Sequence, residues 1–244
     1  MVYNNSNSLG FLHIIMLKLD KTRIIGGKMT KLIIVRHGES IGNAKFLALG
    51  HTDMDLTELG YRQANATAKF LADWQIDAVY SSDLSRAVNT AMPHAEIRGL
   101  EVHKSANLRE VFLGDWENMR VQDVIDAYGT VYTVDWREKF GTFTVPGGES
   151  VMGAADRFYN EIVRISKENE GKTVLVAAHA AIIRAFWGKI SGISPENLAQ
   201  EVEFPSNASY SLATYENGVV IPGEYSCDAH LSEVGITKIA GNHW

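Results

Sequence analysis

The stretch Leu32-Ile33-Ile34-Val35-Arg36-His37-Gly38-Glu39-Ser40 decides the fold of this chain. Four apolar, mostly β-branched residues run directly into Arg, His and Gly, which is typical of a strand buried in a parallel sheet. Arg36 and His37 then stand at the carboxyl end of the strand, where open α/β sheets bind their ligands. Arginine offers a charged fork for phosphate or carboxylate oxygens, and histidine is a nucleophile or proton carrier. Gly38 would let the backbone approach a ligand closely.

The composition is that of an ordinary globular protein. The chain has 244 residues, enough for one large α/β domain or two small ones. A net charge of −6 argues against a nucleic acid or a membrane surface as partner. Cys227 is the only cysteine, which excludes an internal disulfide and fits a reducing compartment. No apolar run approaches the roughly 18–20 residues that span a bilayer, so we expect a cytoplasmic location.

Residues 1–28 are predicted to be a separate, poorly ordered leader. The segment from Leu9 to Leu17 is largely apolar, but its positive charges follow it, which is the wrong order for a secretory signal. The leader is either an artefact of translation that starts upstream of Met29 or a genuine docking arm. Residues 29–244 are then predicted to form one domain, since no linker or internal repeat divides them.

Further strands and helices alternate along the chain. Buried strands are expected at 76–80 and 173–178, a short strand at 101–103, and a hairpin of 209–215 with 219–221 around an Asn-Gly turn. Helices are expected after the Thr57 cap, from Leu84, from about 150 to 168, and from 180 to 190. Residues 39–49 should form a helix or an ordered loop. The pattern indicates an α/β protein.

Three strand-like runs end in residues that can bind or transfer a phosphoryl group: Arg36-His37, Ser81 to Arg86, and His179. If these strands are parallel, their carboxyl ends share one edge and bring two arginines and two histidines together. Each residue alone could be an ordinary surface residue, but the combination with Glu110 suits a phosphate dianion. Arginines stabilise the charge of a transferring phosphoryl group, and a histidine can become covalently phosphorylated.

Four ordered segments carry a resemblance to a known family. They are Arg36-His37-Gly38-Glu39-Ser40, Leu56-Thr57 with Gly60 and Gln63-Ala64, Ser82-x-Leu84-x-Arg86-Ala87, and Leu108-x-Glu110 with Gly114 and Trp116-Glu117. Together with His179 they resemble the histidine phosphatase superfamily, in its phosphoglycerate mutase-like branch, over residues 31 to about 231. The resemblance implies a three-layer α/β/α sandwich with a mostly parallel central sheet and a small cap insertion, here residues 118–145.

The resemblance also implies roles for individual residues. His37 would be the nucleophile, and Glu110 the general acid and later the base for water. The phosphoryl group would be bound by Arg36, Asn43, Arg86, His179 and Ala180. His51 and Asn207 are candidate substrate contacts. Glu39 and Glu117 are rival acids whose spacing does not match the family role.

Two positions depart from the family pattern. Ala180 replaces a glycine after the second histidine. We expect it to start a helix, with its N–H directed at the phosphate. Asn118 replaces the glycine of a Trp-Glu-Gly element, which could alter the cap. The cap is rich in aromatic and basic residues and should select the leaving group, whether a sugar phosphate, a nucleotide or a phosphoglycerate.

The sequence therefore predicts a metal-independent phosphomonoesterase that acts through a phosphohistidine on a small phosphorylated metabolite, with no cofactor. The alternative is a phosphoglycerate mutase that depends on 2,3-bisphosphoglycerate, although 111–116 looks like the phosphatase version. A two-metal phosphatase is disfavoured, because Arg36 and Arg86 would stand beside the cations. Its candidate ligands would be Asp53, Asp55, His37 and His179. A binding protein with an inactive pocket is a further alternative. The oligomeric state stays open, a homodimer included.

Overall fold

The computed structural model describes residues 29–129 and 131–237, so the predicted leader lies outside it. Its centre is a six-stranded sheet in the order β3-β2-β4-β1-β5-β6. The strands are β1 (Thr30–Arg36), β2 (Ala78–Ser82), β3 (Val102–Ser105), β4 (Thr173–Ala178), β5 (Tyr210–Glu216) and β6 (Val219–Pro222). The first four strands are mutually parallel, whereas β5 runs antiparallel to β1, and β6 to β5.

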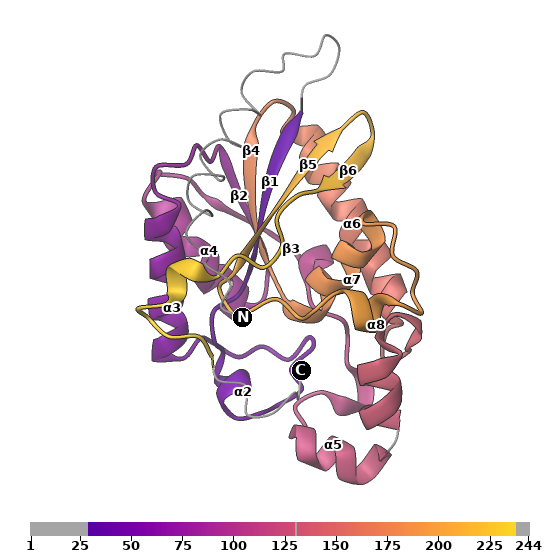
Figure 1. Cartoon of the computed structure of the whole chain (residues 1–244). Coiled ribbons are helices and arrows are strands. Elements are labelled where there is room, and N and C mark those ends of the chain that lie inside the picture. Colours follow the sequence, from indigo (N-terminus) through magenta and orange to yellow (C-terminus); the bar gives the residue numbers. More distant parts are fainter. Residues whose placement is uncertain (1–28, 130, 238–244) are drawn as a thin grey trace, which may run out of the picture.

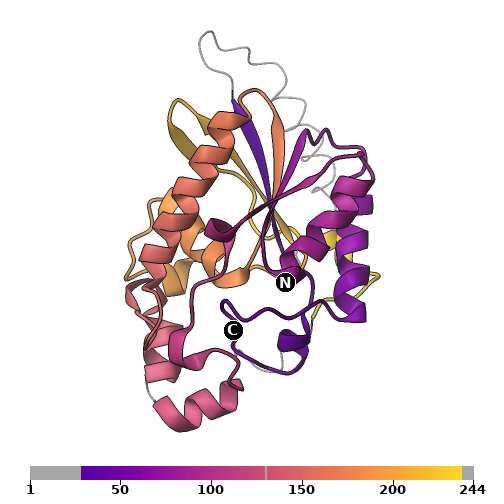
Figure 2. The ribbon, with the colours of Figure 1, turned by 180° about the vertical axis from the view of Figure 1, so that it is seen from behind.

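Helices cover both faces of the sheet (Figures 1 and 2). The α-helices are α2 (Ile41–Ala44), α3 (Glu58–Phe70), α4 (Ser85–Glu96), α5 (Val121–Tyr128), α6 (Val151–Glu168), α7 (Ala180–Ile190) and α8 (Leu198–Glu201). One face is covered by α3 and α4, and the other by α6 and α7. The short α2 and the cap helix α5 lie beyond the carboxyl ends of the parallel strands. The predicted three-layer α/β/α fold is confirmed.

The apolar run in β1 is continuous because helices cover both faces of the sheet at this strand. Leu32 and Ile34 belong to the core beneath α6 and α7. Ile33 and Val35 belong to the core beneath α4. Side chains alternate between the two faces of a strand, so a strand between two helical layers needs an apolar residue at every position.

The structure differs from the sequence prediction in the second strand and in the cap. The second strand continues through Ser81 and Ser82, which pair with β3, although the apolar pattern ends at Tyr80. The cap segment 118–145 holds α5, a π-helical turn over Val131–Trp136 and a 3-10 turn over Phe140–Thr142. A π-helical turn has no distinctive sequence pattern, so the sequence predicts the cap as an insertion without this turn.

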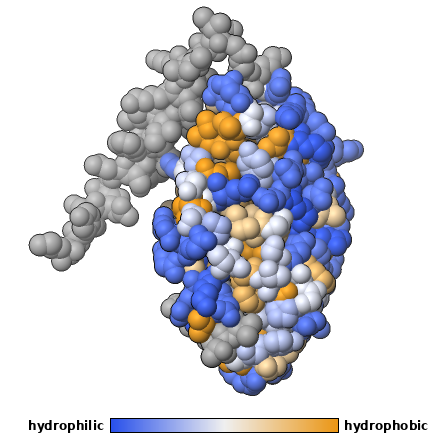
Figure 3. All heavy atoms as spheres, turned by 90° about the vertical axis from the view of Figure 1, so that its right-hand side faces the viewer, coloured by the Kyte–Doolittle hydropathy of each residue, from blue (hydrophilic) through white to orange (hydrophobic). Residues whose placement is uncertain are grey.

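The outer surface over α6, α7 and α8 is a mosaic of hydrophilic and hydrophobic residues (Figure 3). Within 29–129 and 131–237, no helix is both long and apolar enough to cross a membrane. The cytoplasmic location, the single domain and the oligomeric state stay predictions.

Candidate active site

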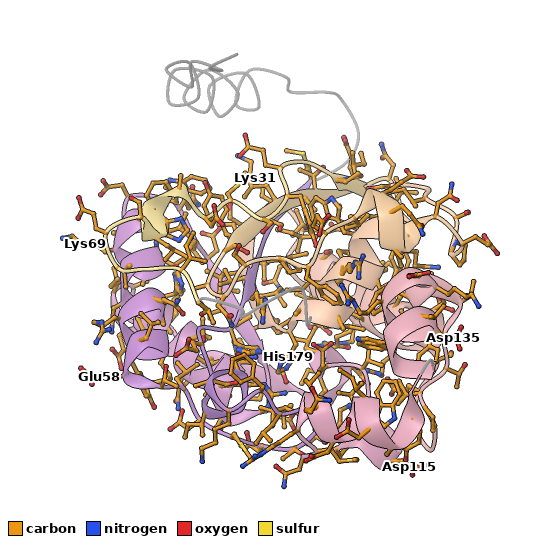
Figure 4. All side chains as sticks on the ribbon, turned by 60° about the horizontal axis from the view of Figure 1, so that its bottom comes forward. Lys31, Glu58, Lys69, Asp115, Asp135 and His179 are labelled. Carbon is orange, nitrogen blue, oxygen red and sulfur yellow. The ribbon has the colours of Figure 1, made fainter. Side chains whose placement is uncertain are left out.

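A pocket opens at the carboxyl ends of the parallel strands. In Figure 4, which turns these ends toward the viewer, His179 lies near the centre, between α3, marked by Glu58 and Lys69, and the cap side, marked by Asp115 and Asp135. The polar residues that line the pocket are Arg36, His37, Ser40, Asn43, Arg86 and Glu110. The cavity holds about 50 Å³, whereas one water needs roughly 10–15 Å³. It therefore has room for an anion of the size of phosphate.

His37 is held as a neutral imidazole. Its Nδ1 lies 2.7 Å from the carbonyl oxygen of Gly38, so this nitrogen carries the proton and Nε2 keeps its lone pair. Burial, and then the charges of Arg86 and Arg36, hold the pKa of His37 well below its ordinary value of 6.5. A neutral imidazole with an unprotonated Nε2 is the form that can act as a nucleophile.

The second histidine, His179, is oriented by an arginine. Nε of Arg86 donates to Nδ1 of His179 over 3.2 Å, so the proton of this ring lies on Nε2. Burial, followed by the charges of Arg86 and His37, lowers the pKa of His179. Its Nε2 is buried with no hydrogen-bond partner among the described residues. The ring meets His37 edge-on at 5.2 Å between centroids, although His179 is not itself one of the residues that line the pocket.

The two arginines are fixed by backbone carbonyls. Nη1 of Arg36 donates to the carbonyl of Pro205 over 2.5 Å, and its Nε is a second buried donor without a partner in the described part of the chain. Arg86 donates through Nη1 to Thr52 at 2.8 Å and through Nη2 to Gly50 at 2.7 Å. Burial lowers the pKa of each guanidinium to about 10, so both stay charged at neutral pH.

Glu110 lines the pocket and binds the first turn of α7. Its Oε2 accepts the N–H of Ala181 at 2.9 Å, and its Oε1 accepts the N–H groups of Ile182 at 2.7 Å and Val111 at 2.9 Å. A carboxylate at a helix N-terminus is stabilised by these donors and by the helix dipole. Ala180 begins the helix as expected and also lines the pocket. Two of the N–H groups that follow it serve Glu110 rather than an anion.

Asn43 lines the pocket, whereas Asn207 supports it from outside. Oδ1 of Asn43 accepts from the backbone and hydroxyl of Ser40, at 3.1 and 3.0 Å, and from Nδ2 of Asn207 at 3.3 Å. This leaves the Asn43 amide nitrogen as the group that can meet an anion. Asn207 also donates to the carbonyl of His37 over 3.0 Å, so it fixes the backbone of that residue. Ser40 lines the pocket too, and sequence reasoning missed it.

Three other candidates do not line the pocket. Nε2 of His51 lies 2.9 Å from the backbone oxygen of Glu110, and its ring packs on Phe112. The carboxylate of Glu39 accepts the hydroxyl of Thr57 at 2.7 Å. Glu117 accepts the backbone N–H groups of the loop at 51 and 52, both at 2.7 Å. Each of these side chains is occupied in holding backbone or a helix cap.

The aspartates considered as metal ligands have structural partners. Asp53 accepts the N–H and hydroxyl of Ser85 at the start of α4, at 2.8 and 2.7 Å. Asp55 accepts from Tyr61 and Asn89. Among the residues that the structure describes, no group of three or more His, Cys, Asp or Glu side chains could hold a metal ion.

Comparison with known proteins matches residues 32–222 to the model of the histidine phosphatase superfamily, branch 1. The chain belongs to this superfamily. It is 33% identical over 208 residues to phosphoserine phosphatase 1 of Hydrogenobacter thermophilus, which covers 84% of this chain and 96% of that protein. It is 32% identical over 177 residues to a 2,3-bisphosphoglycerate-dependent phosphoglycerate mutase of Cytophaga hutchinsonii, which covers 70% of this chain and 82% of that protein.

The superfamily fold is also seen in solved structures. A mycobacterial glucosyl-3-phosphoglycerate phosphatase in complex with VO3 superimposes with a TM-score of 0.74 at 28% identity, covering 81% of this chain and 99% of that chain. The family membership and enzyme class predicted from the sequence are confirmed. The chain is a histidine-phosphatase-type enzyme for small phosphorylated molecules.

Proposed function

We propose that this enzyme hydrolyses small phosphomonoesters in two steps through a phosphohistidine on His37, with neither a metal ion nor a cofactor. One observation carries the proposal. A neutral imidazole with an available Nε2 lies beside a phosphate-sized cavity, next to two buried donors, Nε of Arg36 and Nε2 of His179, that have no partner among the described residues. Buried donors are normally hydrogen-bonded, and a bound phosphoryl group would satisfy both.

In the first step, Nε2 of His37 attacks phosphorus as the bond from phosphorus to the ester oxygen breaks. Glu110 in its protonated form gives its proton to that oxygen, so an alcohol leaves. In the second step, water attacks phosphorus, Glu110 takes a proton from the water, and the phosphorus–nitrogen bond breaks to release inorganic phosphate. Arg36, Arg86 and the Nε2–H of His179 stabilise the charge on the phosphoryl oxygens throughout.

The nucleophile is tested by trapping. The enzyme is mixed with phosphate-labelled p-nitrophenyl phosphate and quenched in alkali, which preserves phosphohistidine, and the labelled residue is identified by peptide mapping. We expect label on His37, and neither label nor turnover in His37→Ala. Label on another residue, or full activity without label, would contradict the proposal. Activity that is lost with a chelator and restored by a divalent cation would contradict metal independence.

The acid is tested with leaving groups of different basicity. Glu110→Gln should slow an alkyl phosphate far more than p-nitrophenyl phosphate, because p-nitrophenolate leaves without a proton. Binding of inorganic phosphate should change little, because the charged donors stay in place. Equal slowing of the two esters would contradict an acid role for Glu110.

A further inference from the structure

The pocket that holds the phosphate-binding donors also has apolar walls. Its apolar lining comes from Leu47, Leu49, Leu113, Trp136 and Phe204. Leu47 and Leu49 follow α2, Leu113 follows Glu110 in the chain, Trp136 ends the π-helical turn of the cap, and Phe204 follows α8. Four separate segments therefore place hydrocarbon or aromatic surface around the space that the leaving group of an ester must occupy.

The two arginines of the phosphate site are the only cationic side chains that line this pocket in the described part of the chain. The guanidinium groups of three other arginines on neighbouring segments already have partners within the protein. Arg109 makes a two-pronged pair with Asp83 at 2.7 and 2.6 Å. Arg157 binds Glu149 at 2.9 Å and three backbone carbonyls.

The third arginine, Arg184, does not line the pocket either. It donates to the carbonyls of Val202 at 2.6 Å and Ala199 at 2.8 Å. Its guanidinium also lies over the rings of Phe140 and Phe204, at 4.6 and 4.2 Å from their centroids. The charge of Arg184 thus fixes Phe204 as part of the apolar lining and is not offered to a substrate.

The apolar lining contains one neutral donor. Trp136 is 1% exposed, and its indole N–H is buried without a hydrogen-bond partner among the residues that the structure describes. The ring is held edge-on by Trp116, Phe140 and Phe143, with centroids 5.9, 5.0 and 5.9 Å away. A buried indole N–H usually has a hydrogen-bond acceptor, and an oxygen of a neutral leaving group, such as a hydroxyl or an ether, can supply one here.

We infer that the natural substrate has an uncharged leaving group with an apolar or aromatic face and one hydrogen-bond acceptor, and that carboxylate-bearing esters are poor substrates. The inference rests on the proposed phosphomonoesterase function. A leaving-group carboxylate would lose its water beside Leu113 and Trp136 and would meet no cation there. Burial of an unpaired charge is strongly unfavourable.

Matched pairs of esters test the inference in the wild-type enzyme. Benzyl phosphate is compared with 4-carboxybenzyl phosphate, and the methyl ester of 3-phosphoglycerate with 3-phosphoglycerate. Both pairs keep the alcohol type and change the charge. We expect kcat/KM to be at least about tenfold higher for the uncharged member of each pair, because the carboxylate must be desolvated without a partner. Equal values, or a preference for the carboxylate, would overturn the inference.

A charge placed at the pocket mouth adds a second test. Leu47→Lys, at a half-buried position of the lining, should raise kcat/KM for the two carboxylate esters several-fold and lower it for the uncharged esters, because it removes apolar surface from the pocket. Ile221→Lys is the matched control, because it adds the same charge at an exposed apolar residue of β6. Equal gains for both members of a pair, or the same gain in the control, would overturn the inference.

The same experiments distinguish a failure of the proposed phosphomonoesterase function from a failure of the leaving-group inference. If neither p-nitrophenyl phosphate nor any member of the pairs is hydrolysed and no histidine is labelled, the phosphomonoesterase proposal itself is wrong, and the inference about its leaving group is wrong with it. If p-nitrophenyl phosphate labels His37 while 3-phosphoglycerate is the better member of its pair, only the leaving-group inference is wrong.

Discussion

The carboxylate of Glu117 holds the loop on which Arg86 depends. It accepts the backbone N–H groups of His51 and Thr52 at 2.7 Å, the hydroxyl of Thr52, and the N–H of Leu113 at 3.1 Å. The carbonyls of Gly50 and Thr52 in turn fix the guanidinium of Arg86. Glu117 does not line the pocket, so we assign it a positioning role instead of the acid role weighed from the sequence.

Glu117→Gln should weaken the binding of inorganic phosphate by roughly tenfold while it leaves the dependence of rate on the leaving group unchanged. The amide replaces one acceptor oxygen with a donor that faces N–H groups, so the loop shifts and Arg86 loses its fixed carbonyls. The measurement is the inhibition constant of phosphate together with kcat/KM for p-nitrophenyl and alkyl phosphates.

Glu96→Gln, at an exposed position near the end of α4, is the matched control and should leave both quantities unchanged. If Glu117→Gln instead slows alkyl phosphates selectively, Glu117 takes part in proton transfer and the positioning role is wrong.

The sequence could predict which residues meet at the pocket because three of them stand directly at strand ends. Arg36, His37 and His179 follow buried apolar runs, and parallel strands bring such ends together. The apolar pattern alone could not predict which glutamate reaches the pocket, and only the family resemblance pointed to Glu110. Glu110 and Glu117 are both in irregular chain, where side-chain direction depends on backbone conformations that no hydrophobic period reveals.

At the scale of elements, the start of α3 packs directly against the turn that follows β1. A Cβ on Gly38 would lie 2.5 Å from the carbonyl oxygen of Gly60, and a Cβ on Gly60 would lie 2.0 Å from that of Glu39. The structure therefore shows a close approach of Gly38 to the backbone of α3. This contact holds Glu39, and through it the His37 turn, against the helix.

Gly60→Ala should lower the free energy of unfolding by about 1–3 kcal/mol through overpacking, although alanine in a helix is normally about 1 kcal/mol better than glycine. The neighbouring atoms are backbone and have little freedom to move. Urea unfolding measures the change. Lys69→Ala, on the exposed side of the same helix, is the control and should stay within about 0.5 kcal/mol. A stabilised Gly60→Ala protein would show that the two backbones can separate without cost.

The elements that sequence analysis placed best are those with the most regular burial. The predicted ranges 173–178 and 180–190 match β4 and α7, because both elements are buried along nearly their whole length. The cap was predicted only as an insertion over residues 118–145. Its π-helical turn ends at Trp136, which packs among aromatic rings from both sides of the cap. Such packing depends on tertiary contacts that a local pattern does not encode.

The whole molecule buries neutral histidines, and this makes its stability depend on pH. Burial, and then the charges of Arg98 and His230, lowers the pKa of His94 to about 3. The pKa values of His37 and His179 are lowered as well. In the unfolded chain these residues bind protons near pH 6.5. The folded protein is therefore fully stabilised above that pH and loses stability as pH falls from 6.5 toward the folded pKa values.

His94→Leu should reduce the loss of unfolding free energy between pH 7 and pH 5 by about 2 kcal/mol, since each pH unit below 6.5 contributes about 1.4 kcal/mol per histidine. At pH 5 His94 is still neutral in the folded protein and charged in the unfolded chain. Urea unfolding at the two pH values gives the difference, and His103→Leu at an exposed position of β3 is the control. An unchanged difference in His94→Leu would show that this histidine is protonated in the folded state.

The position of β1 has a consequence for how the chain is made. β1 lies between β4 and β5, whose partner residues stand some way further along the chain, from Thr173 to Tyr215. A ribosome releases the amino-terminal part first, so the buried apolar run of β1 has neither neighbouring strand until most of the polypeptide has been synthesised. Contacts between such distant segments form slowly, and unpaired apolar strands aggregate. The folding yield of the newly made chain should therefore fall when translation pauses before residue 173.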